Sequence, residues 1–157
     1  MFLQKNKFRL DEKAKAVDKA FKEALEIAGN DAVLHFRKSF DNQGFTDENL
    51  EHWKPRKGQI RALGANVKGG LVNTKKTLTK TGALKRSIHK TMLVGLRLKV
   101  VSDLVYAQIH NQGLTGKAWG KHYFKMPKRK FMGNSRKLER IQMAKILAKV
   151  NTAWKNA

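Results

Sequence analysis

The sequence contains no cysteine and only two prolines. The lack of cysteine excludes a disulfide framework, and with it thiolate-based zinc and redox sites. No apolar run reaches the roughly 18 residues that a membrane-spanning helix needs. The N-terminus also lacks the charged region followed by an apolar region that marks a signal peptide. We therefore expect a protein that works in a cytoplasm, or in something assembled there.

Acidic residues are scarce in most of the chain. Residues 1–52 hold 9 Lys and Arg against 10 Asp and Glu, whereas residues 53–157 hold 25 against 2, a net charge of +23. General acid–base catalysis needs a carboxylate or histidine beside a group that tunes its pKa, and after residue 52 only Asp103 and Glu139 are acidic. The missing acidic cluster disfavours a basic, metal-dependent nuclease.

Other catalytic signatures are missing as well. The five histidines show no metal-ligand spacing, and the glycines match no phosphate-binding loop. His110 is the candidate base, but no obvious acid orients it, so a hydrogen-bonding role at a strand end or turn is favoured. The sequence predicts that the protein is not an enzyme and has no catalytic residue, no metal site and no cofactor.

Positive charge is what the chain has in abundance, with a formal net charge of +22 at pH 7. Such an excess indicates a polyanionic neighbour: nucleic acid, an acidic protein surface or anionic lipid. Basic and aromatic residues are interleaved in Lys117–Lys125 and in Lys128–Phe131. Mixtures of this kind suit single-stranded nucleic acid, although aromatic residues in a loop more often attach it to the core or to a neighbouring subunit.

Apolar periodicity predicts helices at both ends of the chain. Residues 11–28 have a helical stripe that Asp11 can cap and that Gly29 can end, and 31–41 forms a second helix or continues the first as one bent helix. A C-terminal helix is expected from about Ser135 to Trp154, and Ser135 or Asn134 can cap its start. One of its faces is apolar and the other is rich in lysine and arginine.

The middle of the chain predicts loops and short strands. Residues 42–82 read as a long loop with short elements, and 83–102 as a helical turn that leads into two strands with Gly95 between them. We expect a strand end near 105–109, a further loop at 114–125, and an edge strand over Lys125–Phe131. The residues expected in the core are Leu84, Ile88, Tyr106 and Ile109.

These elements predict a single domain spanning 1–157 with an α+β fold. In it, a small and mostly antiparallel sheet is packed on one face by the N-terminal helix, or helix pair, and by the C-terminal helix. A long basic loop or arm is expected at about 54–80.

Three stretches of the sequence occur in a recognisable order. The first is Phe40–Phe45, followed by Trp53. The second is Leu78–Ile88, and the third is Tyr106–Gly113, followed by Met126–Ser135. Together they resemble the phage virion morphogenesis family, whose Mu-like members are tail-completion proteins. The resemblance covers most of the chain, from about residue 15 to the C-terminal helix. The residues that match the family pattern are Gly44, Trp53, Thr81, Gly82, Leu84, Ile88, Tyr106, Ile109, His110, Asn111, Gly113, Pro127 and Phe131.

The resemblance implies a structural virion protein of a tailed phage, located in the tail or neck and assembled in the host bacterial cytoplasm. It implies a homo-oligomeric ring, a hexamer, at the head–tail junction around the DNA channel. Its partners would be other neck, tail-tube or connector proteins, with non-specific DNA contact in the channel and no membrane. The alternative is a basic nucleic-acid-binding module, ribosomal-protein-like or packaging-associated. The residues expected to face DNA or a partner are Lys128, Arg129, Lys130, Arg136, Lys137 and Arg140.

Overall fold

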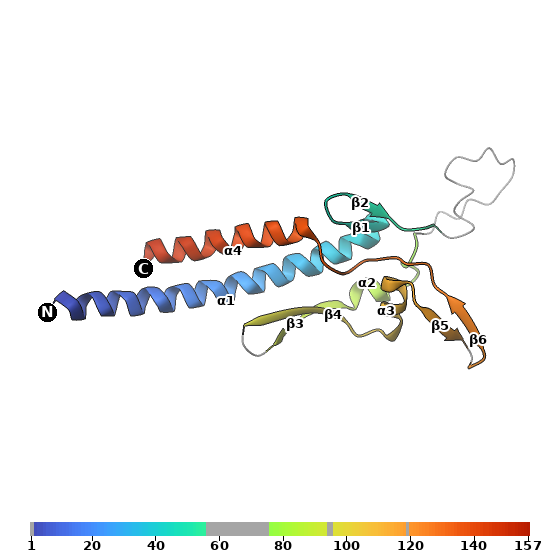
Figure 1. Ribbon diagram of the computed structural model, residues 1–157, viewed down its shortest axis with the longest axis horizontal. Helices are drawn as coiled ribbons and strands as arrows, with labels where there is room; N and C mark the ends of the chain where they lie inside the picture. The colour runs from blue at the N-terminus through green and yellow to red at the C-terminus, as the bar shows by residue number, and fades with distance from the viewer. Residues whose placement is uncertain (1, 56–75, 94–95, 119) are drawn as a thin grey trace.

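The computed structural model describes residues 2–55, 76–93, 96–118 and 120–157. The helices are α1 (Phe2–Asn42), α2 (Ala83–Arg86), α3 (Val105–Gln112) and α4 (Arg136–Asn156). The strands are β1 (Gly44–Thr46), β2 (Leu50–His52), β3 (Ile88–Leu93), β4 (Arg97–Ser102), β5 (Thr115–Ala118) and β6 (His122–Lys125). The molecule is elongated, with α4 along one side of α1 and the β3–β4 hairpin along another (Figure 1).

The predicted α+β class is confirmed, but the expectation of one sheet is wrong. The strands form three separate antiparallel pairs, β1–β2, β3–β4 and β5–β6. Each strand pairs with its neighbour in sequence, because a local turn closes a hairpin at little cost in chain entropy. Helices and irregular segments then separate the three hairpins. The layering differs as well, because α1 packs against both α4 and the β3–β4 hairpin instead of sharing one sheet face with α4.

Helix α1 runs without a break for 41 residues, so the alternative of one continuing helix is confirmed and the end at Gly29 is wrong. Gly29 is buried, and a Cβ at this position would lie 2.5 Å from the Leu98 Cδ1 of β4. The glycine therefore allows the hairpin to approach α1 closely. The helix ends at Asn42 instead, and Gln43 follows it in a left-handed conformation with a φ of 52°.

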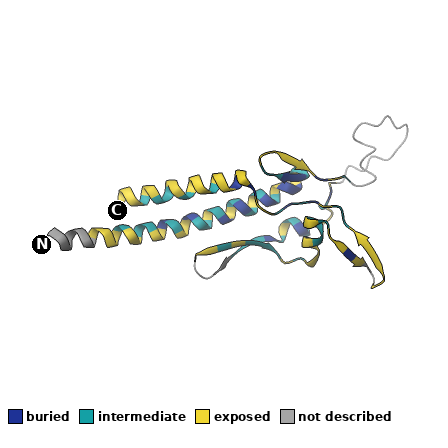
Figure 2. Ribbon diagram, in the orientation of Figure 1, coloured by how far each residue is buried: buried dark blue, intermediate teal, exposed yellow. Residues whose placement is uncertain are grey.

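The core lies where the C-terminal half of α1 meets the rest of the chain (Figure 2). Its centre is aromatic, since the Phe40 ring centroid lies 5.1 Å from that of Phe131 and 5.3 Å from that of Trp53. The buried residues of this cluster are Ala32, Phe36, Phe40, Phe45, Trp53, Leu84, Ile88, Ala107, Phe131 and Leu138. Residues from both ends of the chain therefore close one core.

Two of the four expected core residues are confirmed. Leu84 and Ile88 are buried, whereas Tyr106 is 42% exposed and Ile109 is only partly buried. The expectation for Tyr106 is wrong because residues 105–112 form a helix and no strand ends there. On that helix Ala107 faces the core, and its neighbour Tyr106 faces outward.

Further expectations for the second half of the chain have mixed outcomes. The helical turn and two strands over 83–102 are confirmed, and residues 114–125 form the β5–β6 hairpin where a loop was expected. The edge strand at Lys125–Phe131 is wrong, because this segment uses its backbone N–H groups on α3. Gly95 and most of the 54–80 loop lie outside the described residues.

Helix α4 begins as the sequence predicts. The Ser135 hydroxyl accepts a hydrogen bond from the Leu138 backbone N–H at 3.3 Å, which satisfies one of the amide groups left unpaired at a helix N-terminus. Ser135 also donates to the Thr46 carbonyl at 3.3 Å. The cap therefore attaches the start of α4 to the β1–β2 hairpin as well as to its own first turn.

Candidate functional site

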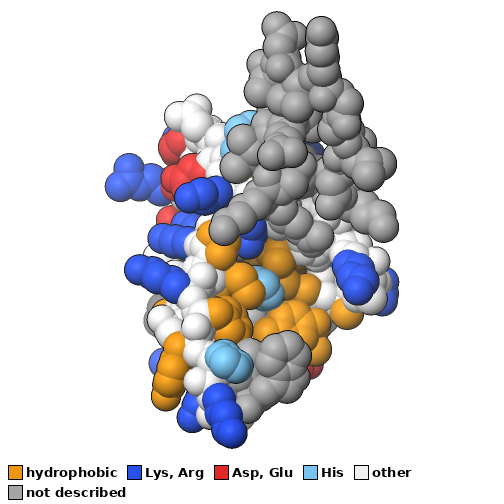
Figure 3. Space-filling model, turned by 90° about the vertical axis from the view of Figure 1, so that its right-hand side faces the viewer, with side chains coloured by type: hydrophobic (Ala, Val, Ile, Leu, Met, Phe, Trp, Pro, Cys, Tyr) orange, Lys and Arg blue, Asp and Glu red, His pale blue; other side chains and the backbone are white. Residues whose placement is uncertain are grey.

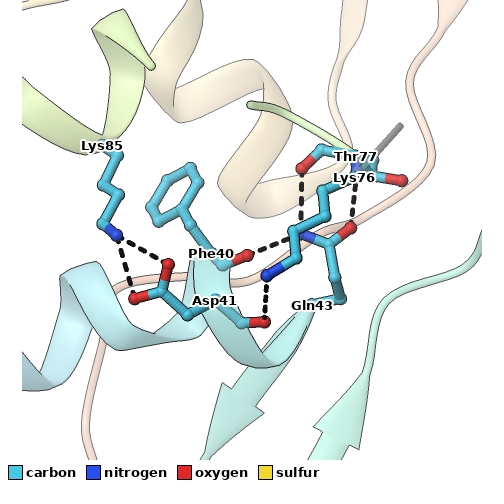
Figure 4. Close-up of polar contacts among 6 residues, drawn as sticks. All are labelled: Phe40, Asp41, Gln43, Lys76, Thr77 and Lys85. Carbon is cyan, nitrogen blue, oxygen red and sulfur yellow. Dashed lines mark hydrogen bonds and ion pairs between the residues drawn. The ribbon is translucent and has the colours of Figure 1, made fainter. Parts of the chain in front are cut away.

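The end of α1 is tied to the segment that precedes α2. The Gln43 side chain donates to the Phe40 carbonyl at 2.6 Å and to the Thr77 carbonyl at 3.2 Å, and it accepts from the Thr77 N–H (Figure 4). Beside it, the Lys85 amine lies 2.7 Å from the Asp41 carboxylate. Gln43 was not predicted as important, although its place directly before Gly44 in the Phe40–Phe45 stretch was the available signal.

The stretch His110–Gly113 forms a joint between α3 and the segment 126–132. The Asn111 Oδ1 accepts from the backbone N–H groups of Phe131 at 2.8 Å and Met132 at 3.0 Å, and its Nδ2 donates to the Met132 carbonyl at 3.1 Å. The His110 carbonyl accepts from the Arg129 N–H at 2.8 Å. Asn111 therefore gives this irregular segment the backbone partners that a strand would otherwise supply.

Gly113 completes this joint, which we call the Asn111 joint. It caps the C-terminus of α3 with a φ of 74°, a conformation that glycine adopts without strain. A Cβ at Gly113 would lie 2.8 Å from the Lys128 backbone nitrogen. The Met126 N–H also donates to the Leu114 carbonyl at 3.1 Å, which closes the base of the β5–β6 hairpin.

The other residues that match the family pattern lie in the core or at turns. Trp53 is buried, and its indole N–H donates to the Lys130 carbonyl at 2.6 Å. Thr81 and Gly82 precede α2, where the Thr81 hydroxyl accepts from the Ala83 N–H at 3.3 Å. Gly44 is buried in β1, and Pro127 is partly buried in the joint segment. None of these positions brings reactive groups together.

His110 lies on α3, so the expected role at a strand end or turn is not what the structure shows. Its Nδ1 is buried and has no hydrogen-bond partner among the described residues. Burial lowers the pKa of the His110 imidazole below its usual value, and the charge of Arg129 lowers it further. The neutral ring is therefore favoured in the folded protein.

This environment predicts a pH dependence of stability. Because the folded-state pKa of His110 is lowered, the unfolded chain binds the proton more readily, so stability falls as the pH drops below the unfolded value of about 6.5. We expect the melting temperature to fall between pH 7.5 and 5.5, and His110→Phe to flatten this profile. Thermal melts of both proteins across that range would measure it. Parallel profiles would show that His110 titrates as it does in the unfolded chain.

The six candidate surface cations do not have a common environment. The expectation that Arg129 faces a partner is wrong, because its side chain is buried and donates through Nε and Nη2 to the Lys54 carbonyl. The Lys130 amine lies 3.9 Å from the Phe45 ring centroid. Arg140 pairs with Glu48 at 2.7 Å. The exposed members are Lys128, Arg136, Lys137 and Arg140.

An exposed combination of cations and an aromatic ring lies on the β5–β6 hairpin. Lys117 pairs across the ladder with Tyr123, and Thr115 with Lys125, so these four residues share one face. Tyr123 is 74% exposed, and the Lys117 amine lies 5.4 Å from its ring centroid. No acidic residue occurs between Asp103 and Glu139. We call this face, with Lys121 in the adjoining turn, the hairpin face.

The end of the molecule that carries α3 and this hairpin also gathers hydrophobic side chains on its surface, with lysine and arginine near the edges (Figure 3). Val105 is 91% exposed there, and Tyr106, Leu114 and Phe124 are each more than one third exposed. An exposed apolar patch of this kind is typical of a surface that contacts another molecule.

No metal or membrane site emerges from the described residues. Within 2–55, 76–93, 96–118 and 120–157, no group of three or more His, Asp or Glu side chains is placed to hold a metal ion. None of the helices in this part of the chain is long and apolar enough to cross a membrane. The arrangement therefore offers contact surfaces and structural joints.

Comparison with known proteins gives one match. The model of the phage virion morphogenesis family matches residues 13–150. No curated protein and no solved structure matches the chain.

Proposed function

Because this chain belongs to the phage virion morphogenesis family, a family of structural and assembly proteins, we propose that it completes the tail of a tailed phage. In this proposal it forms a homo-oligomeric ring, a hexamer, at the head–tail junction around the DNA channel. Its partners there are other neck, tail-tube or connector proteins. It catalyses no reaction, and it reaches the virion after assembly in the bacterial cytoplasm.

The family match carries this proposal, and the use of the matching residues supports it. Leu84, Ile88 and Phe131 are buried in the core, while Asn111 and Gly113 form the joint that positions the β5–β6 hairpin. Because these matching residues serve packing and backbone hydrogen bonds, they suit a structural protein. An enzyme would instead need polar groups that converge on one pocket.

The direct test is a phage in which this chain is not made. We expect such a phage to accumulate filled heads and separate tails and to produce almost no infectious particles, and the chain supplied from a plasmid should restore joining. Electron microscopy of lysates would count joined and separate particles. Normal particles without the chain would refute the proposal, and density for the chain elsewhere in the particle would refute its place at the junction.

We also propose that the hairpin face meets DNA phosphates in the channel. Its support is the exposed Lys117, Tyr123 and Lys125, with no acidic residue between 103 and 139. Such a contact is electrostatic and independent of base sequence. It also favours the second candidate function, a basic nucleic-acid-binding module. A ring subunit oligomerises without nucleic acid, whereas a binding module stays monomeric and needs polynucleotide.

Replacing Lys117, Lys121 and Lys125 together by glutamine should weaken binding to duplex DNA and flatten its salt dependence. Each phosphate contact adds roughly 0.9 to the slope of log K against log salt, so three lost contacts lower the slope by about 2.7. Fluorescence anisotropy between low and physiological salt would measure it. The matched control replaces three lysines of α1, Lys15, Lys19 and Lys38, which are exposed. An equal loss in both variants would mean that binding follows net charge alone.

A further inference from the structure

Helix α4 exposes several apolar side chains, while two of its lysines form ion pairs with α1. Lys145 pairs with Asp31 at 2.6 Å and Lys149 pairs with Glu23 at 2.8 Å, so both lysines lie against α1. Met143 is 58% exposed, Leu147 52% and Trp154 49%. The usual surface helix has the opposite arrangement. The basic face expected from the sequence is exposed at Arg136, Lys137, Arg140, Lys145 and Lys155, and the structure adds a second, apolar surface that was expected to pack against the core.

The exposed apolar residues and the partly buried Val150 form a continuous stripe. Met143, Leu147, Val150 and Trp154 are spaced by four, three and four residues, which places them on one face of the helix. The residues beside them, Ala144, Ala148 and Asn151, are exposed and uncharged. We call this surface the α4 stripe.

A groove of about 560 Å³ lies beside α1, with α4 as one wall and β4 as the other. It is mostly apolar, and it includes Leu25, Ala32, Leu98, Val100, Leu138 and Ile146. The small side chains of Ala28 and Ala32 leave room in it for larger side chains. Its position next to α4 means that the stripe of the same molecule cannot enter it. No helix of the described residues fills it, and we look for the occupant on another molecule.

The charge of the groove selects the kind of partner. The chain has 34 Lys and Arg in 157 residues, yet none of the sixteen residues that line the groove is cationic, and one, Glu139, is acidic. At the α4 stripe, Lys145 and Lys149 pair with acidic residues of α1, and the Lys13 amine lies 5.2 Å from the Trp154 ring centroid, so this cation would meet a groove whose lining holds no cation. Two copies of this strongly basic chain can therefore approach through these two surfaces without bringing like charges together.

We propose that the partner is a second copy of this chain, with the α4 stripe of one copy seated in the groove of the next. The convex stripe and the concave groove are complementary in shape, polarity and charge. Because they are different surfaces, the contact is head-to-tail, and repetition with a closing rotation gives a ring. This inference rests on the proposed function, for which it supplies the contact between subunits.

The absence of cysteine from the chain permits a clean cross-linking test. Leu147→Cys, in the stripe, is mixed with an affinity-tagged Val100→Cys, in the groove, and oxidised. We expect a disulfide between the two kinds of chain on a non-reducing gel, and none when Leu34→Cys, an exposed position on α1 outside the groove, replaces Leu147→Cys. A disulfide formed only between two Leu147→Cys chains would show that two stripes meet, and would overturn the head-to-tail contact.

A second measurement uses the intact chain in solution. Leu147→Glu should abolish the oligomer in light scattering, because it adds a charge to the apolar stripe and brings it near Glu139 of the groove. The dissociated chain should keep the circular dichroism spectrum of the folded protein, since the side chain is half exposed. Leu34→Glu, at an exposed apolar position of α1, is the matched control and should stay oligomeric. An oligomer that survives Leu147→Glu, or a wild-type chain that is monomeric up to its solubility limit, would overturn the inference.

The two proposals can fail separately. If the chain is found at the head–tail junction but makes no contact through the stripe, the interface is wrong and the virion role stands. If the chain assembles through the stripe but is missing from purified particles, the interface stands and the virion role is wrong.

Discussion

Phe131→Ala is expected to lower the free energy of unfolding by about 3–5 kcal/mol. The Phe131 side chain has no exposed surface and packs against Phe40 of α1. Its truncation loses the transfer free energy of the ring and leaves a cavity among residues of α1, the segment after β2 and α4. These segments are fixed by hydrogen bonds at Trp53 and Ser135, so the cavity cannot collapse easily.

Urea unfolding followed by circular dichroism would measure this loss. Phe124→Ala is the matched control, because Phe124 is 37% exposed on β6 and contributes nothing to the core cluster. We expect its effect to be smaller than that of Phe131→Ala by a factor of at least two. If the two substitutions destabilised the protein equally, Phe131 would not hold the two ends of the chain together as described.

The sequence predicted those parts of the fold that depend on local pattern. The stripe on α1, the Ser135 cap and the strands on either side of residue 95 follow from periods of 3.6 and 2 residues and from capping chemistry. Leu84 and Ile88 are four residues apart, and both proved to be buried. Gly29 led to a wrong helix end, because the sequence alone does not distinguish a glycine that lets a neighbouring hairpin pack closely from one that ends a helix.

The surface could be predicted much less well, because the environment of each cation depends on partners distant in sequence. The acidic residues of the first 52 positions pair with cations from later elements, as Glu26 does with Lys90 and Asp31 with Lys145. Arg129 stands in a basic run, yet its side chain is buried against Lys54. Composition gave the net charge correctly, but only the packing showed which cations are used inside the protein.

Asn111 is a second residue whose physical role could not be predicted from the sequence. The sequence marked it through the resemblance, and its physical role depends on a segment twenty residues away. Its side chain makes three hydrogen bonds with Phe131 and Met132, and both ends of the β5–β6 hairpin are attached to this joint. The joint therefore sets the direction of the hairpin face relative to the core.

Asn111→Ala is expected to lower the free energy of unfolding by about 2–4 kcal/mol, because two backbone N–H groups and one carbonyl lose their partner in a partly buried place. Gln108→Ala, on the exposed side of the same helix, should change it by less than about 0.5 kcal/mol. The substitution should also loosen mainly the segment 126–132 that Asn111 holds. Trypsin should therefore cut after Lys125 and Lys128 in Asn111→Ala before it cuts in α1 or α4. Unfolding curves together with mass spectrometry of the first fragments would measure both effects. Loss of stability with simultaneous cleavage throughout the chain would mean that Asn111 supports the whole fold and does not specifically hold the hairpin.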